Sequence, residues 1–259
     1  LSAGEVAAQA ITTDARGLET EEGTYPAASG YELPYYLAKP EGEGPYPAVI
    51  VVNEVFGIHE YIKDVCRRFA KLGYMAIAPE LYARQGDASG YTDNAKLFAD
   101  IVNKVPDAQV MSDLDACAKW ASTNGGNATR LGITGFCWGG RITWLYDAHN
   151  PNVKAGVAWY GRLVGDKDPL RPLHPVDIAD KLHAPVLGLY GAADAGIPVT
   201  TVDTMKAALE KGPAAAKAST FVVYPDTPHA FHADYRPSYR EKEARDGWNR
   251  TVEWFKKYV

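Results

Sequence analysis

The chain has 259 residues, of which 46% are hydrophobic and 23% are charged. That length and composition suit one large α/β domain with a full hydrophobic core. The net charge of -5 argues against nucleic acid or an anionic membrane as the main partner. No apolar run in the sequence approaches the roughly 20 residues that span a membrane.

The three cysteines do not have the spacing of a metal site or of a disulfide framework. Cys66 and Cys117 fall on the apolar faces of predicted helices, where a thiol serves as a small hydrophobe. We therefore expect neither a metal nor another cofactor. The remaining partners that we expect are a small-molecule substrate and, at most, a weak homo-oligomer.

The beginning of the chain resembles the end of a secretory signal. Small residues at 7–10 precede the segment Ile11-Thr-Thr-Asp14, which favours cleavage after Ala10 and export to the periplasm. The alternative is a small-residue tail without a targeting role and a cytoplasmic protein. In either case we expect residues 1–22 to be a flexible segment and residues 23–259 to form a single domain.

Predicted strands and helices alternate along most of the chain. Apolar residues alternate over 31–37, which predicts a half-buried antiparallel edge strand. Continuous apolar runs, typical of buried parallel strands, occupy 48–52, 74–78, the stretch that begins at Leu131, 155–159, 185–190 and 220–224. Helical spacing is found before Gly73, over 92–104 and 107–123, around Met205, and around Trp248 near the C-terminus. This order predicts a mostly parallel twisted sheet with helices on both faces.

Chemically active side chains gather just past the ends of these strands. In a parallel sheet, ligands bind at the carboxyl ends of the strands, so residues that follow different strands can share one site. The residues in this position are Glu54, Arg84, Cys137, Asp194 and His229.

The stretch Leu131-Gly-Ile-Thr-Gly-Phe-Cys-Trp-Gly-Gly140 has the pattern of a nucleophile elbow. It begins as an apolar strand and ends in a glycine-rich corner, with Cys137 at the position that serine usually occupies. Flanking glycines let the strand and helix backbones pass close together. We therefore predict Cys137 as the nucleophile, with the amide of Trp138 directed at any oxyanion formed there.

A thiol nucleophile needs a base, and a histidine base needs an acidic partner. On this architecture the chain order is nucleophile, acid, histidine, which assigns the acid to Asp194 and the base to His229. Asp226 is the rival carboxylate, but its place three residues before the histidine suits a turn. His232 is close enough in sequence to compete with His229.

These residues together resemble the dienelactone hydrolases (carboxymethylenebutenolidases), which are α/β-hydrolases with a Cys-Asp-His triad. The resemblance extends from about Gly23 to the C-terminus. It is carried by the segments Asn53-Glu-Val-Phe-Gly57, Pro79-Glu-Leu-Tyr-Ala-Arg84, Gly135-Phe-Cys-Trp-Gly-Gly140, Tyr190-Gly-Ala-Ala-Asp194 and His229-Ala-Phe231.

The resemblance implies further roles. Glu54 would lie beside the thiol and help to activate it when substrate binds. The amides of Val55 and Trp138 would form the oxyanion hole, and Arg84 would hold a carboxylate of the substrate. We also expect Phe56 and Tyr160 to contact substrate.

The sequence departs from the family at three positions near these segments. Asn53 replaces the usual Gln, and Trp138 is bulkier than the leucine often found there. Position 233 is alanine, whereas the family has a second arginine for the substrate carboxylate. Arg236 is the candidate to replace it, from a different direction.

The resemblance implies an enzyme that opens unsaturated lactones through a thioester acyl-enzyme. Two other functions fit the same residues. One is a general carboxylesterase that acts on small esters. The other is a thiol redox protein that uses Cys137 as an accessible sulfur, although no resolving cysteine lies nearby in sequence.

Overall fold

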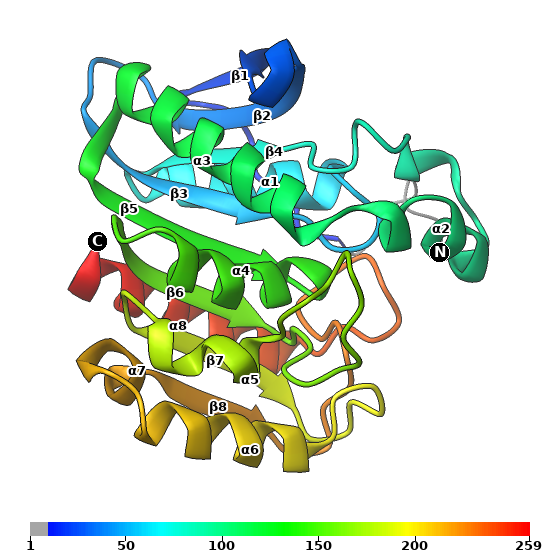
Figure 1. The fold of residues 1–259 in the computed structure, drawn as a ribbon. Helices are drawn as coiled ribbons and strands as arrows, with labels where there is room; N and C mark the ends of the chain where they lie inside the picture. The colour runs from blue at the N-terminus through cyan, green and yellow to red at the C-terminus, as the bar shows by residue number, and fades with distance from the viewer. Residues whose placement is uncertain (1–9) are drawn as a thin grey trace.

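A computed structural model of the chain describes residues 10–259. The small-residue segment at 7–10 that suggested a signal therefore falls almost wholly outside the described residues. Eight strands form one sheet in the order β1-β2-β4-β3-β5-β6-β7-β8 (Figure 1). Their bounds are β1 Leu18–Pro26, β2 Glu32–Pro40, β3 Tyr46–Val52, β4 Met75–Pro79, β5 Gly126–Phe136, β6 Val153–Trp159, β7 Val186–Gly191 and β8 Thr220–Tyr224.

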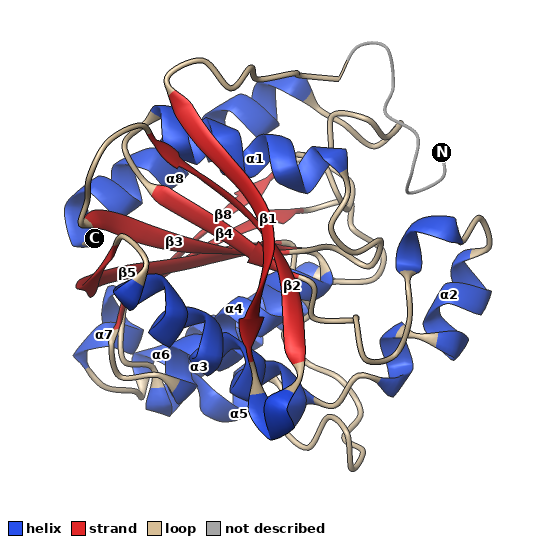
Figure 2. Cartoon of the chain, turned by 90° about the horizontal axis from the view of Figure 1, so that it is seen from above, coloured by secondary structure: helices blue, strands red, loops and turns tan. Residues whose placement is uncertain are grey.

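Helices cover both faces of this sheet. The α-helices are α1 Glu60–Lys71, α2 Asn94–Asp100, α3 Asp107–Thr123, α4 Trp138–His149, α5 Pro175–Ile178, α6 Val199–Glu210, α7 Ala214–Ala218 and α8 Glu241–Tyr258, and short 3-10 helices are η1 Ala28–Gly30, η2 Ala88–Gly90, η3 Val102–Lys104 and η4 Ala179–Lys181. Figure 2 shows α1 and α8 on one face and α3, α4 and α6 on the other, while α2 lies apart from both. The predicted fold, a mostly parallel sheet between two helical layers, is confirmed.

The parallel strands are the ones that the sequence marks as continuous apolar runs. From β4 through β8 every neighbouring pair is parallel, and only β1 and β2 are antiparallel to their neighbours. All five residues of β4 and all six of β7 are buried, because helices cover both sides of these strands. The carboxyl ends of the parallel strands therefore meet at one edge, on the right in Figure 1.

Residues 18–22 were expected to belong to a flexible segment, but they are part of β1, which begins at Leu18. This strand pairs with the whole of β2, so the segment predicted as an edge strand is second in the sheet. β1 shows no hydrophobic periodicity because only Leu18 and Tyr25 of its nine residues are buried. Residues before it are also attached to α1, where the Thr13 amide donates to Asp64 at 2.5 Å.

Asp147 on α4 is a buried carboxylate that anchors the turn before β7. Its Oδ1 accepts hydrogen bonds from the amides of His183 and Ala184, each at 3.0 Å. Its Oδ2 has no hydrogen-bond partner among residues 10–259. Burial raises the pKa of Asp147 from an ordinary 3.8 to about 7.

We predict that Asp147→Asn stabilises the protein more at pH 8 than at pH 5. The folded chain binds this proton more tightly than the unfolded chain does, so the wild type loses stability as the pH rises from about 4 to about 7. Asparagine keeps the acceptor and has no proton to lose. The melting temperature of the variant should exceed that of the wild type by on the order of 3 °C at pH 8. An Asp203→Asn control on the exposed side of α6 should show no such trend, and a pH-independent difference for Asp147→Asn would contradict the prediction.

Candidate active site

Cys137 stands at the corner between β5 and α4 in a strained backbone conformation. Its φ is 59° and its ψ is -115°, a region that residues with a Cβ seldom occupy. The corner is this sharp because the backbones around it nearly touch. A Cβ at Gly135 would lie 2.1 Å from the carbonyl oxygen of Gly139, and one at Gly139 would lie 2.4 Å from that of Val52. The glycines are required by this packing, and the thiol is left half-buried at the edge of the sheet.

Asp194 and His229 come from the loops after β7 and β8 and are hydrogen-bonded to each other. His229 Nδ1 lies 2.5 Å from Asp194 Oδ2. The other carboxylate oxygen of Asp194 accepts the amide of Gly196 at 3.0 Å, which fixes the orientation of the acid. The two loops meet because Gly191 has no side chain, since a Cβ there would lie 2.2 Å from the carbonyl oxygen of Thr227.

The pKa of the His229 ring depends on Cys137 as well as on Asp194. Burial alone would lower the pKa of His229, because the charged ring loses water. Attraction to the Cys137 thiolate and the hydrogen bond to Asp194 outweigh burial and raise the pKa of His229 to about 10. His229 is therefore placed to accept a proton and to hold it between Asp194 and Cys137.

The rival residues occupy other environments. Asp226 is exposed, with a φ of 53°, and forms part of the turn after β8. His232 is buried behind the elbow, where its ring stacks on Phe136 and its Nδ1 lies 2.5 Å from the Tyr61 hydroxyl. Burial keeps the pKa of His232 well below its ordinary range, so the ring is neutral. Of the two histidines, only His229 lines a cavity with Cys137.

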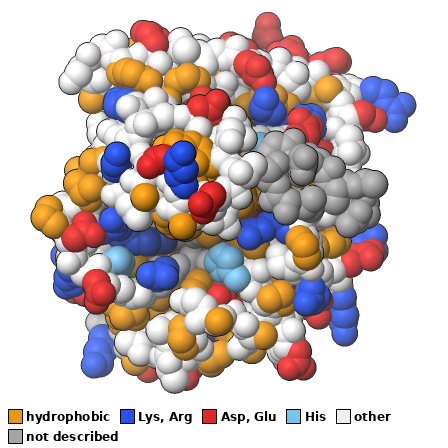
Figure 3. Space-filling view, turned by 90° about the vertical axis from the view of Figure 1, so that its right-hand side faces the viewer, with side chains coloured by type: hydrophobic (Ala, Val, Ile, Leu, Met, Phe, Trp, Pro, Cys, Tyr) orange, Lys and Arg blue, Asp and Glu red, His pale blue; other side chains and the backbone are white. Residues whose placement is uncertain are grey.

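A cavity of about 870 Å³ opens beside Cys137, and Figure 3 shows the face with this hollow and a histidine near its centre. Val55, Trp138, Tyr160 and His229 are among its lining residues. The backbone amides of Val55 and Trp138 donate no hydrogen bond to another group of residues 10–259. Two residues that line the cavity with Cys137 therefore have amides without a partner among residues 10–259.

The structure brings Glu54 near the elbow but directs its carboxylate elsewhere. The side chain is fully buried, and it accepts hydrogen bonds from His59 Nε2 at 2.9 Å and from the Tyr235 hydroxyl. Arg236 lies 3.6 Å from its second oxygen. Burial would raise the pKa of Glu54, but His59, Arg236 and Tyr235 together lower it, so the carboxylate is ionised.

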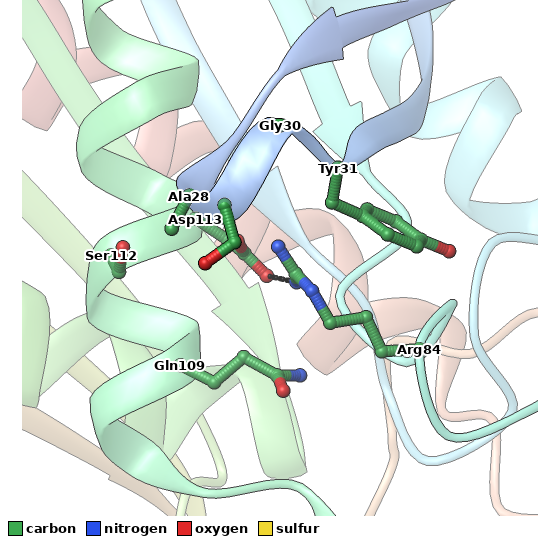
Figure 4. A pocket seen from close by; sticks show the side chains of 8 residues that line it. Ala28, Gly30, Tyr31, Arg84, Gln109, Ser112 and Asp113 are labelled. Carbon is green, nitrogen blue, oxygen red and sulfur yellow. Dashed lines mark hydrogen bonds and ion pairs between the residues drawn. The ribbon is translucent and has the colours of Figure 1, made fainter.

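Arg84 is not brought to this cavity. It lines a separate cavity of about 460 Å³ with Tyr31 and Gln109, where its guanidinium pairs with Asp113 at 2.5 Å and lies over the Tyr31 ring (Figure 4). The substrate contact expected of Arg84 therefore has no geometric basis here. Its partner Asp113 lies on α3.

Arg236 and Phe56 also stay outside the lining of the Cys137 cavity. Arg236 lies over the Phe56 ring at 5.3 Å, and both pack beside Glu54. Tyr160 does line the cavity, with its ring 5.0 Å from that of His229. Its φ is 36°, and its buried hydroxyl has no partner among residues 10–259.

Within residues 10–259, the structure contains no group of three or more His, Cys, Asp or Glu side chains that could hold a metal ion. The described helices are also too short or too polar to cross a membrane.

Comparison with known proteins assigns the chain to a family. The profile of the dienelactone hydrolase family matches residues 33–259. The chain belongs to the dienelactone hydrolase family. It is thus a hydrolase that acts on ester bonds.

Relatives in this family are similar over nearly their whole length. A Methylorubrum extorquens protein named "Putative carboxymethylenebutenolidase" is 61% identical over 260 residues, covering 100% of this chain and 88% of that protein. A crystal structure titled "Putative Dienelactone Hydrolase" from Klebsiella pneumoniae has 58% identity and a TM-score of 0.89, covering 93% of this chain and 99% of that one. A more distant Bradyrhizobium protein, named "Probable 2-oxo-3-(5-oxofuran-2-ylidene)propanoate lactonase", is 31% identical over 84% of this chain and 86% of its own length.

Sequence reasoning missed several residues of this dienelactone hydrolase site. His59 and Tyr235 are both buried against Glu54. A histidine two residues after the Asn53–Gly57 segment was the available signal. Arg141 was also missed, although it lines the cavity and binds Asp107 through two hydrogen bonds of 2.8 Å.

We predict that replacing Cys137 with serine lowers the pKa of His229 from about 10 toward its ordinary value near 6.5. The hydroxyl stays neutral, so the imidazolium loses the attraction of the sulfur while its hydrogen bond to Asp194 remains. A titration of the His229 ring followed by NMR measures this change. A Cys66→Ser control, which alters a buried thiol on α1, should leave the His229 titration where it is. Equal pKa values of His229 in the wild type and in Cys137→Ser would contradict the placement of the His229 ring beside the Cys137 sulfur.

Proposed function

We propose that this chain opens lactones and related activated esters through a Cys137–His229–Asp194 triad and a thioester intermediate. The observation that carries the proposal is the strained elbow cysteine. Its thiol faces the same cavity as a histidine that is hydrogen-bonded to a buried carboxylate, beside two free amides.

In the first half of the reaction, His229 takes the proton of the Cys137 thiol, and the resulting thiolate attacks the carbonyl carbon of the ester to form a C–S bond. The carbonyl oxygen becomes an oxyanion against the amides of Val55 and Trp138, each worth on the order of 3 kcal/mol of barrier. The ester C–O bond then breaks. The departing oxygen takes the proton of His229 and, in a lactone, stays attached to the acyl chain.

In the second half, His229 acts as a base toward water. The thioester sulfur is neutral, so the charge that held the proton on His229 is gone and the ring can accept one. Water adds to the thioester carbonyl and gives its proton to His229. The C–S bond breaks, and the Cys137 thiolate and the His229 imidazolium are restored with release of the acid. Asp194 stabilises the imidazolium in both halves.

Sulfur chemistry favours lactones and esters over amides as substrates. A thiolate is a better leaving group than an amine, so a thiol adduct of a peptide returns to reactants more readily than it expels the amine. An enolate or a stabilised alkoxide leaves more easily. The lactonase name of the Bradyrhizobium relative supports the same substrate class. A general carboxylesterase is the alternative, and relative rates on unsaturated lactones and simple aryl esters distinguish the two.

The redox alternative receives less support from the positions of the other thiols. Cys66 and Cys117 are both fully buried, and burial raises their pKa values. Neither lines the cavity of Cys137, so neither is placed to resolve an oxidised sulfur there.

Glu54 requires a rearrangement before it can act on the thiol. Its carboxylate is held by His59, Tyr235 and Arg236. We propose that substrate binding loosens these contacts and lets Glu54 approach Cys137, as the family resemblance implies.

Cys137→Ala should lower kcat/KM on unsaturated lactones at least about a thousandfold, because no other group on the elbow can form the acyl-enzyme. Steady-state hydrolysis, with mass spectrometry of the trapped thioester in the wild type, measures the effect. Cys66→Ala serves as the matched control and should retain activity. Lactone hydrolysis that survives in Cys137→Ala would end the proposal.

Glu54→Gln should reduce kcat/KM on the same lactones by about tenfold or more, if the carboxylate activates the thiol after substrate binds. Glu60→Gln, an exposed carboxylate at the start of α1, is the control and should have no effect. A normal rate for Glu54→Gln would leave Glu54 with a purely structural role. Melting temperatures of both variants separate a folding defect from a catalytic one.

A further inference from the structure

We infer that Arg162 is the specificity-determining residue of the Cys137 cavity and selects esters with an apolar body and a carboxylate end. The inference rests on the proposed hydrolysis of esters at Cys137. It concerns a residue that neither the sequence motifs nor the expected carboxylate clamp included.

The cavity is too large for a small lactone alone. Its volume of about 870 Å³ is at the upper end of the range of about 300–1,000 Å³ that suits ligands of drug size. Part of its wall is apolar and comes from the segment after β4. Phe98 on α2 lines the cavity with its side chain 38% exposed, and Val102 of η3 lies next to it. An apolar group on the substrate would cover this exposed ring.

Three arginines line the same cavity, and two of them already have partners. Arg141 is bonded to Asp107, to His174 and to the Leu173 carbonyl. Arg171 pairs with Asp168 at 3.2 Å. Arg162 forms no ion pair or side-chain hydrogen bond with any of residues 10–259, and its side chain is exposed. Arg162 is thus the guanidinium available to a ligand.

The backbone holds Arg162 in a fixed position relative to the thiol. It follows Gly161, where a Cβ would lie 2.2 Å from the amide nitrogen of Arg141 on α4. The loop that begins at Arg162 is closed on itself by His174, whose Nε2 lies 2.7 Å from the Asp166 carbonyl oxygen. Because α4 also begins at the elbow, the packed turn at 160–161 fixes the backbone of Arg162 relative to Cys137.

Asp166 is the opposing charge at this end of the cavity. Asp166 lines the cavity four residues after Arg162, is exposed, and has no ion pair within the described chain. Arg162 and Asp166 therefore act in opposite senses on a charged substrate. Removing the first should weaken binding of an anionic ester, and removing the second should strengthen it.

The test compares two esters that differ only at the end of the acyl chain. Mono-4-nitrophenyl adipate carries a carboxylate where 4-nitrophenyl hexanoate carries a methyl group. The wild type should favour the adipate, and Arg162→Gln should lower the adipate-to-hexanoate ratio of kcat/KM on the order of fivefold, mainly through KM. Arg162→Lys should retain part of the preference, and Asp166→Asn should increase it. The preference should also weaken as salt is added.

Control variants separate this effect from a change in the loop. Lys167→Gln alters a cation of the same loop that pairs with Asp177 and does not line the cavity, so the ratio should stay constant. Phe98→Ala should lower the ratio of hexanoate to acetate ester turnover. An adipate-to-hexanoate ratio that Arg162→Gln leaves unchanged overturns the inference, including the case in which both esters are lost equally. If Cys137→Ala still hydrolyses these esters, the proposed function itself fails, which is a distinguishable result.

Discussion

The close approach of four backbone segments around the elbow is the constraint on which the site depends. The end of β3, the corner after β5, the first turn of α4 and the turn after β6 are packed so tightly that glycine is required at each contact. A Cβ at Gly140 would lie 2.4 Å from the Trp159 carbonyl oxygen, and one at Gly161 would lie 2.3 Å from the carbonyl carbon of Gly140. This packing imposes the positive φ of Cys137, because the chain must turn from strand to helix within one residue. The packing of these four segments at the centre of the sheet holds the strained backbone of Cys137 in place.

Parallel pairing of β7 with β8 then brings the other two residues of the triad together. Asp194 and His229 are 35 residues apart in sequence, yet both follow strands whose ends are in register, with Gly191 opposite Tyr224. The loops can touch only where Gly191 admits the Thr227 carbonyl. The acid and the base are therefore positioned by strand register, and the nucleophile by backbone packing.

These local causes explain what the sequence could predict. The elbow, the order of acid and histidine, and the buried strands depend on spacings of a few residues, and each is visible in the chain. β1 was missed because it buries only two side chains. The direction of Arg84, which lies in the turn after β4, could not be predicted, since it depends on a partner 29 residues away on helix α3. The roles of His59 and Tyr235 required knowing that residues 54 and 235, distant in sequence, share one buried space.

The separation of Glu54 from the cavity has an electrostatic consequence for the thiol. A thiolate next to a second buried anion would be destabilised, because like charges repel strongly where water is excluded. Glu54 is ionised and close enough that both charges act on Tyr160 and Tyr82. His59, Tyr235 and Arg236 contact its carboxylate and offset its charge, and none of the three lines the Cys137 cavity. A carboxylate is thus kept within reach of Cys137 with its charge offset, and loosening those three contacts would change the electrostatic environment of the sulfur at the moment when substrate occupies the site.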